Sequence, residues 1–139
     1  MKTAIIALTK NGTQTAIKLG KLMKSDIYVK YPHEEKGINV YDLLNEMVES
    51  VDPGEQNIMF LPYIFGSNYN PQAKACLIGM DSSHTKEQMA RAVFEGIVFC
   101  HMVHTEKLLM NRSKPKAVRL AGGAANSKVW VQIFADVFN

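Results

Sequence analysis

The stretch ACLIGMDSSHTKEQMARAVFE, residues 75–95, carries the strongest folding signals of this chain of 139 residues. Its first six residues are apolar enough to predict a short strand over 75–80. A capping box follows, because the Thr85 hydroxyl can accept a hydrogen bond from the Gln88 amide and the Gln88 side chain can return it. A long helix is therefore expected from Thr85 to about Leu109, with one face buried. Its buried stripe is predicted at Met89, Val93, Gly96, Cys100 and Val103.

A second informative pattern lies near the end of the sequence. Residues 117–121 (AVRLA) predict a strand, Gly122 and Gly123 a turn, and residues 127–137 a helix with an apolar face. Glycines let backbone amides approach a ligand closely, and the positive end of a helix dipole favours an anion or a polar ring edge. Asn126 or Ser127 can cap this helix or can instead face a ligand.

Three shorter signals organise the middle of the chain. Apolar residues at helical spacing predict a helix over 39–51, and Asp52-Pro53-Gly54 would end it. Residues 57–63 (NIMFLPY) predict a strand that ends at Pro62 or lies at a sheet edge. The turn-rich segment GSNYNP follows it as a loop.

The N-terminal part predicts a βαβ unit. Strands are expected at residues 3–8 and 26–31, with a helix over 13–23 between them. The polar loop PHEEKG then places a boundary near Gly37. We therefore expect an α/β chain in two parts, residues 1–36 and 37–139. The strands at Thr3, Asp26 and Ala117 should be parallel, and the direction of the short strands near Met59 and Leu77 is left open.

Composition limits the classes of function. A formal net charge of +3, with 21% charged residues and no basic run beyond KPK, gives no basis for binding nucleic acid. No apolar run approaches the length of a membrane span and the N-terminus lacks a signal-peptide layout, so a cytoplasmic protein is expected.

Cys76 and Cys100 lie in apolar segments and are predicted to be buried thiols without a disulfide. His101 and His104 lack the four-residue spacing of a helical zinc pair, so no metal site is predicted.

Residues 75–95, together with LAGGAANSKVWVQIFAD at 120–136, resemble the C-terminal domain of the FGGY carbohydrate kinases. The flanking words FLPYIFGSNYNP and EGIVFCHMVH are most similar to the branch that phosphorylates ketopentoses such as L-xylulose. Many relatives have G-E-R-x-P in the loop where this chain has Ser67 and Asn68. The resemblance covers about residues 37–139. The agreement with the family pattern extends over Ala75, Leu77, Gly79, Met80, Gln88, Met89, Ala92, Val93, Phe94 and Glu95.

The resemblance implies an incomplete ribonuclease-H-like (actin-like ATPase) domain and ATP-dependent phosphorylation of a sugar, with Mg²⁺. It implies that Gly122, Gly123 and Ser127 line the adenosine side of the ATP site. The family's phosphate loop and the segment with its catalytic aspartate have no counterpart here, and sugar would be bound only in a complete kinase. Neither Asp42 nor Asp81 lies in a matching motif, so no catalytic base is assigned. We expect the isolated chain to bind adenine nucleotide weakly at best, without turnover.

Gln132 and Asp136 also match the family pattern, although Asp136 is expected to serve packing or capping.

Two other interpretations remain open. The chain could be an inactive interaction fragment that self-associates through exposed apolar surface. Alternatively, residues 1–36 are similar to the N-terminus of cobalt-precorrin 5A hydrolase, which would make the chain a composite or a remnant of a cobalamin-biosynthesis enzyme.

Overall fold

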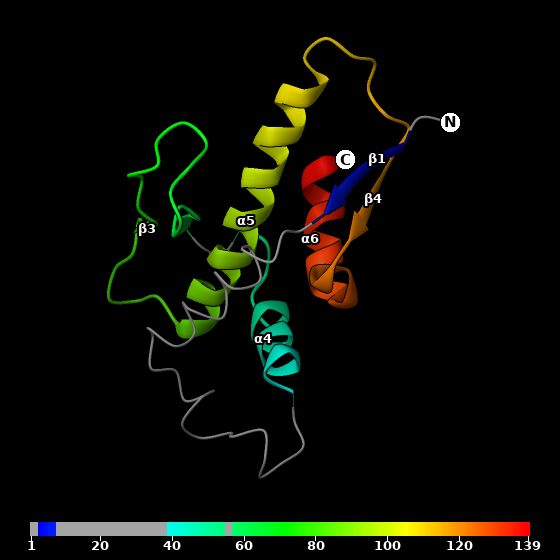
Figure 1. The fold of residues 1–139 in the computed structure, drawn as a ribbon. Helices are drawn as coiled ribbons and strands as arrows, with labels where there is room; N and C mark the ends of the chain where they lie inside the picture. Colours follow the sequence, from blue (N-terminus) through cyan, green and yellow to red (C-terminus); the bar gives the residue numbers. More distant parts are fainter. Residues whose placement is uncertain (1–2, 8–38, 55–56) are drawn as a thin grey trace.

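The computed structural model describes residues 3–7, 39–54 and 57–139, and shows two small sheets with a long helix between them (Figure 1). The elements are, in chain order, β1 (Thr3–Ala7), α4 (Val40–Glu49), β2 (Met59–Leu61), β3 (Cys76–Ile78), α5 (Lys86–Leu109), β4 (Ala117–Ala121), the 3-10 helix η1 (Gly123–Asn126) and α6 (Lys128–Phe138). The α/β class predicted from the sequence is confirmed.

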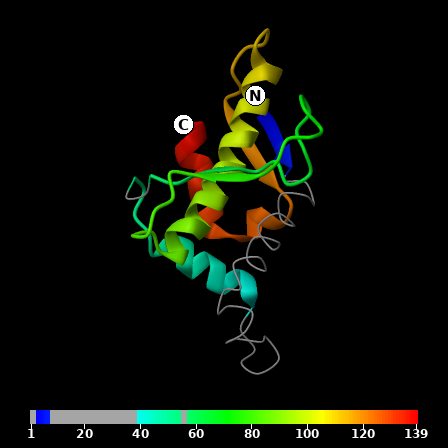
Figure 2. The same ribbon diagram turned by 90° about the vertical axis from the view of Figure 1, so that its left-hand side faces the viewer.

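Helix α5 is the central element of the fold. Figures 1 and 2 show it running between the β2–β3 side of the molecule and the side formed by β4 and α6, with α4 near its N-terminal end. The predicted capping box starts it: the Gln88 amide donates to Thr85 Oγ1 (3.2 Å), and the Thr85 amide donates to Gln88 Oε1 (2.9 Å). The core around it consists of Val40, Leu44, Val48, Ile58, Phe60, Ala90, Ala92, Val93, Phe94, Ile97, Val98, Ala124, Trp130, Ile133 and Phe134.

The two sheets have different strand directions. β1 and β4 are parallel, in register from Thr3 opposite Ala117 to Ala7 opposite Ala121, as the sequence predicted for these two segments. β2 and β3 are antiparallel, which settles the direction left open for the short strands. The predicted helix at 13–23 and strand at 26–31 lie outside the described residues.

Local chemistry sets the bounds of the shorter elements. The Asn39 side chain caps α4 by accepting a hydrogen bond from the Tyr41 amide (3.0 Å), and the helix ends at Glu49, before the predicted stop at 52–54. β2 ends at Leu61, directly before Pro62, which has no amide hydrogen for a further ladder bond.

The predicted burial along α5 is wrong in its second half. Buried residues lie between Ala90 and Val98, whereas Val103 is 43% exposed and Leu108 is 72% exposed. Within the first half burial extends around most of the helix, so a single stripe does not describe it. The reason is tertiary: the core formed with α4 and β2 includes α5 residues only up to Val98, whereas Val103 lines an open pocket beside β2 and the loop after it.

The predicted burial of both thiols is also wrong in part. Cys76 is exposed, because it lies on the two-stranded sheet β2–β3, which has one face toward solvent. Cys100 is half-buried on α5, and this burial raises the pKa of its thiol. Both are free cysteines, as expected.

Arg91 joins α5 to the end of α4. The residue is 6% exposed, and its guanidinium Nη1 donates to the backbone oxygens of Val48 (3.2 Å) and Val51 (2.5 Å). Nε donates to Glu95 Oε1 (2.7 Å), one turn further along α5. The last carbonyls of a helix have no partner within the helix. Arg91 therefore adds a side-chain donor at the end of α4 and just beyond it, where the Val48 carbonyl also accepts a hydrogen bond from the Val51 amide (3.4 Å).

We predict that Arg91→Met strongly destabilises the protein. The change removes the hydrogen bonds from Arg91 to the Val48 and Val51 carbonyls and its ion pair with Glu95, and losing one partner of a buried ion pair costs about 3–5 kcal/mol. Chemical denaturation would measure the free energy of unfolding. Arg112→Met, at an exposed position, is the control and should change it by less than about 0.5 kcal/mol. Equal effects of the two substitutions would contradict the structural role of Arg91.

Gly96 allows α5 and β2 to approach each other closely. A Cβ added at this position would collide with the Phe60 carbonyl oxygen, which is backbone and cannot rotate away. The absence of a side chain at Gly96 is therefore a packing requirement.

We predict that Gly96→Ala lowers stability by about 1–3 kcal/mol, the usual cost of overpacking a core. In an unconstrained helix the same change would raise stability by about 1 kcal/mol. The sign of the change in stability therefore tests the close contact with β2. The midpoint of urea unfolding is a suitable measure. Gly54→Ala is the comparison, because an added Cβ there meets no atom within 4 Å and only the positive φ of 86° opposes it. A stabilised Gly96→Ala variant would rule out the close approach.

Candidate functional site: a pocket between α4 and α6

A cavity of about 290 Å³ lies between the first turns of α4 and the start of α6. It brings together residues from three distant parts of the chain, including two of the three predicted site residues. Its lining consists of Asn39, Tyr41, Asp42, Asn45, Phe94, Gly123, Asn126, Ser127 and Trp130. Gly122, the third predicted residue, precedes the lining residue Gly123 in the turn. We call this cavity the α4–α6 pocket.

The glycine turn has the layout that the sequence predicted. β4 ends at Ala121, Gly122 follows with φ of 98°, and η1 begins at Gly123. A positive φ of this size is strained for a residue with a side chain, so the sharp exit from β4 depends on glycine at 122. The turn then directs the chain through η1 into α6, whose first residues line the pocket.

Ser127 is the residue that caps α6, which settles the alternative between Asn126 and Ser127. Its Oγ accepts a hydrogen bond from the Trp130 amide (3.1 Å) and donates to Asn45 Oδ1 (2.7 Å). The hydroxyl has only one hydrogen to donate, and Asn45 takes it. Ser127 therefore ties α6 to α4, while Asn126 lies exposed at the pocket.

The floor of the pocket is aromatic. Phe94 and Trp130 stack with their ring centroids 4.3 Å apart, and both side chains are buried. The indole Nε1 of Trp130 is buried and has no acceptor among the described residues. The floor is thus apolar, and the buried indole N–H, which has no acceptor among the described residues, lies beside it.

The rim of the pocket is polar and carries one carboxylate. Tyr41 and Asp42 are exposed on the first turn of α4, where the helix dipole favours a negative charge. No lysine or arginine is among the lining residues of this pocket. An uncharged ligand portion with hydrogen-bond donors fits this lining better than a phosphate group does.

The other acidic residues weighed from the sequence lie elsewhere. Asp136 is exposed on α6 and accepts a hydrogen bond from Gln132 Nε2 (2.7 Å). Asp81 is in the exposed turn before α5, where hydrogen bonds from Ser83 lower the pKa of its carboxyl. Neither lines the α4–α6 pocket.

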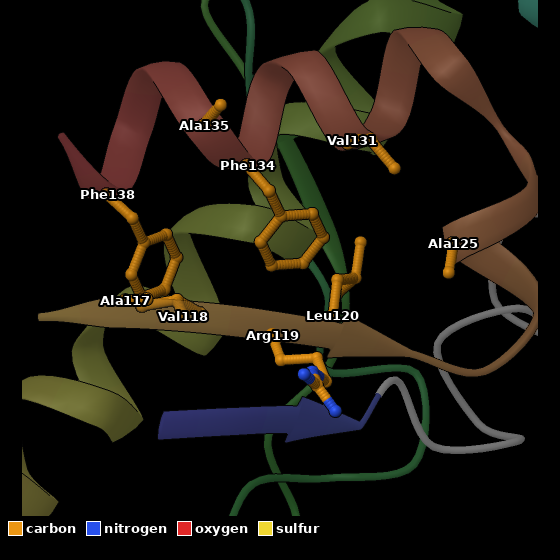
Figure 3. A pocket seen from close by; sticks show the side chains of 9 residues that line it. All are labelled: Ala117, Val118, Arg119, Leu120, Ala125, Val131, Phe134, Ala135 and Phe138. Atoms are coloured by element: carbon orange, nitrogen blue, oxygen red, sulfur yellow. The ribbon is translucent and has the colours of Figure 1, made fainter. Parts of the chain in front are cut away.

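A larger cavity, of about 530 Å³, lies between β4 and α6 (Figure 3). Phe134 and Phe138 extend from α6 toward β4, whereas Arg119 extends to the side of β4 away from α6 (Figure 3). Apart from Arg119, the lining side chains are apolar. A binding site needs a few convergent polar groups to orient its ligand, so this cavity is the weaker candidate.

Comparison with known proteins identifies the family of this chain. The family model "FGGY family of carbohydrate kinases, C-terminal domain" matches residues 14–139. The chain belongs to the FGGY carbohydrate kinases. The match confirms the resemblance found at residues 75–95 and 120–136.

Curated and solved relatives of this FGGY chain are sugar kinases. It is 34% identical over 97 residues to the L-xylulose/3-keto-L-gulonate kinase of Escherichia coli, and 32% identical over 96 residues to a probable L-xylulose kinase of Pasteurella multocida. These alignments cover 70% and 69% of this chain. The xylulose kinase of Rhodospirillum rubrum aligns with a TM-score of 0.72 and 25% identity, covering 90% of this chain and 24% of that structure. The FGGY chain spans about a fifth of the length of its curated relatives.

Some expectations are not tested by this match. The matched region begins at residue 14, within the segment predicted to be separate, and the boundary near Gly37 stays a prediction, as does the likeness of residues 1–36 to cobalt-precorrin 5A hydrolase. Within the described ranges, no helix is long and apolar enough to cross a membrane. In the same ranges, no three His, Cys, Asp or Glu residues gather as metal ligands would.

Sequence reasoning missed the α4 wall of the pocket in this FGGY chain. Tyr41 and Asn45 belong to a helix whose pattern reveals only its apolar face, and nothing local indicates that its first turn meets α6. The partners Ser127 and Asn45 are 82 positions apart. Only the tertiary structure shows that they are neighbours.

We predict that Ser127→Ala destabilises the FGGY chain by about 1–2 kcal/mol, because it removes both the helix cap and the bond to Asn45. A double-mutant cycle with Asn45→Ala, followed by thermal denaturation, would isolate the bond between them. Its coupling energy should be about 0.5–1.5 kcal/mol. Ser50→Ala, an exposed serine at the end of α4, is the matched control. Strict additivity of the two changes would show that the Ser127–Asn45 bond adds no stability.

Proposed function

We propose that this chain forms the adenosine side of the ATP site in an FGGY sugar kinase, and that the α4–α6 pocket holds the nucleoside. The observation that carries the proposal is the pocket itself: an aromatic floor and a polar rim without a cation, beside the strand–glycine–helix turn. Family membership supports ATP as the phosphate donor. The predicted residues Gly122, Gly123 and Ser127 keep their assignment to this site.

The size and lining of the pocket suit a nucleoside. Small-molecule sites usually measure about 300–1,000 Å³, and the pocket volume of about 290 Å³ lies just below that range. A purine base would lie against the Phe94–Trp130 floor, since flat aromatic surfaces stack favourably. The ribose would then lie at the polar rim, and the phosphates outside the pocket.

The phosphates belong near the glycine turn in this proposal. Gly122 and Gly123 lack side chains that would block a close approach, and the N-terminus of α6 offers the positive end of a helix dipole. Mg²⁺ would be held mainly by the phosphates, and no residue of this chain is assigned to it. The base that activates the sugar hydroxyl would come from another part of a complete kinase.

We further propose an incomplete ribonuclease-H-like domain, located in the cytoplasm, whose complete kinase acts on a ketopentose. Relatives named as L-xylulose kinases, 32–34% identical, support that sugar class. Gluconokinase of Bacillus subtilis is also 33% identical over 108 residues, so the sugar has to be tested directly. The pure chain is not expected to consume ATP when L-xylulose is added, and sugar-dependent ATP consumption by it would overturn this part of the proposal.

Nucleotide binding can be tested on the pure chain. Mg-ATP and Mg-ADP should each raise its melting temperature in a concentration-dependent way, because a ligand that binds only the folded state stabilises it. The indole N–H signal of Trp130, the single tryptophan of the chain, should shift in an NMR titration with the same nucleotides. Gly123→Val should abolish both effects by filling the pocket.

The control for this titration is Asn68→Val, at an exposed position in the loop after β2. It should behave like the unsubstituted chain. If neither nucleotide at millimolar concentration changes the melting temperature or the indole signal, the proposal fails. The interaction-fragment interpretation would then lead, since β2, β3 and their flank expose Met59, Ile78 and Met80.

A further inference from the structure

We propose that Asp42 makes the α4–α6 pocket selective for ribonucleotides, by accepting hydrogen bonds from the ribose hydroxyls. This proposal rests on the proposed function and adds to it the residue that distinguishes ribose from deoxyribose. Asp42 is a specificity-determining residue here and takes no part in phosphoryl transfer.

The carboxylate of Asp42 is available for a ligand. It lines the pocket, it is exposed at the rim, and it forms no hydrogen bond or ion pair with another described residue. An ionised carboxylate only accepts hydrogen bonds, and its two oxygens have room for several donors. Two neighbouring hydroxyl groups are the kind of partner that such a group can bind with both oxygens.

The position of Asp42 selects the ribose over the phosphates. Phe94 and Trp130 form the floor and are 4% and 5% exposed, so the flat base belongs there and the sugar belongs at the rim. The hydroxyls at C2′ and C3′ leave the ribose on the edge opposite to the C5′ phosphates. Because like charges repel, the carboxylate side of the pocket favours the hydroxyl edge and leaves the phosphates to the glycine turn.

The same carboxylate also has a structural role, and the test must distinguish this role from ribose binding. Asp42 is in the first turn of α4, where a negative charge stabilises a helix by a few tenths to about 1 kcal/mol. Removing the charge by Asp42→Asn would therefore lower the stability of the chain. The structural role alone would leave the ratio of affinities for two nucleotides unchanged.

The experiment compares Mg-ATP with Mg-2′-deoxy-ATP on the pure chain. The indole N–H signal of Trp130, which lies in the pocket floor, reports the dissociation constants even when binding is weak. A hydrogen bond to a charged group is worth about one power of ten in affinity, so deoxy-ATP should bind about tenfold more weakly than ATP. In Asp42→Asn that ratio should fall to about twofold, because a neutral amide is a weaker acceptor.

Glu46→Gln is the matched control, since Glu46 lies one turn further along α4, is exposed and does not line the pocket. It should keep the tenfold ratio. An equal ratio in the unsubstituted chain and in Asp42→Asn overturns the assignment, even if Asp42→Asn melts at a lower temperature. The assignment is also overturned if Asp42→Asn changes only the preference for ATP over inosine triphosphate, because Asp42 would then contact the base. Absence of binding by every nucleotide contradicts the proposed function itself.

Discussion

The buried guanidinium of Arg91 is the contact on which the position of α4 depends. It holds the C-terminal carbonyls of α4 against the middle of the fold, with Glu95 balancing its charge. A helix of 10 residues is a rod about 15 Å long, so fixing one end largely determines where the other end points. The opposite end of α4 supplies Tyr41 and Asp42 to the pocket. A contact in the core thereby places groups at the surface.

The pocket depends on two hydrogen-bonded contacts between helices rather than on one element. Arg91 fixes α4 to α5, and the Ser127–Asn45 bond fixes α4 to α6. Phe94 and Trp130 fill the space where the three helices meet. The fold therefore builds the site from segments that share no local sequence pattern. If either contact is removed, an FGGY chain can retain the glycine turn and still lose the pocket.

Local signals in the sequence predicted most of the elements, because caps, turns and helix breakers act over a few residues. The Thr85–Gln88 box and the strand–glycine–helix turn at 117–127 are examples. Burial was predicted less well. Val103 fits the apolar stripe of α5 but is 43% exposed, in an open pocket beside β2 and the loop after it, and Arg91 carries a charge yet is buried. Whether a side chain is covered depends on where distant segments pack, which spacing along one helix does not encode.

The parallel pairing of β1 with β4 has a consequence for the order of folding. Its partners are more than a hundred residues apart in sequence, so β1 is synthesised long before the strand that completes its ladder. Closing such a long loop is entropically expensive and makes contacts of this kind form slowly. Until β4 is available, the edge of β1 presents unpaired backbone groups, which favour association between chains. On the ribosome, β1 therefore emerges more than a hundred residues before the strand β4 that it pairs with.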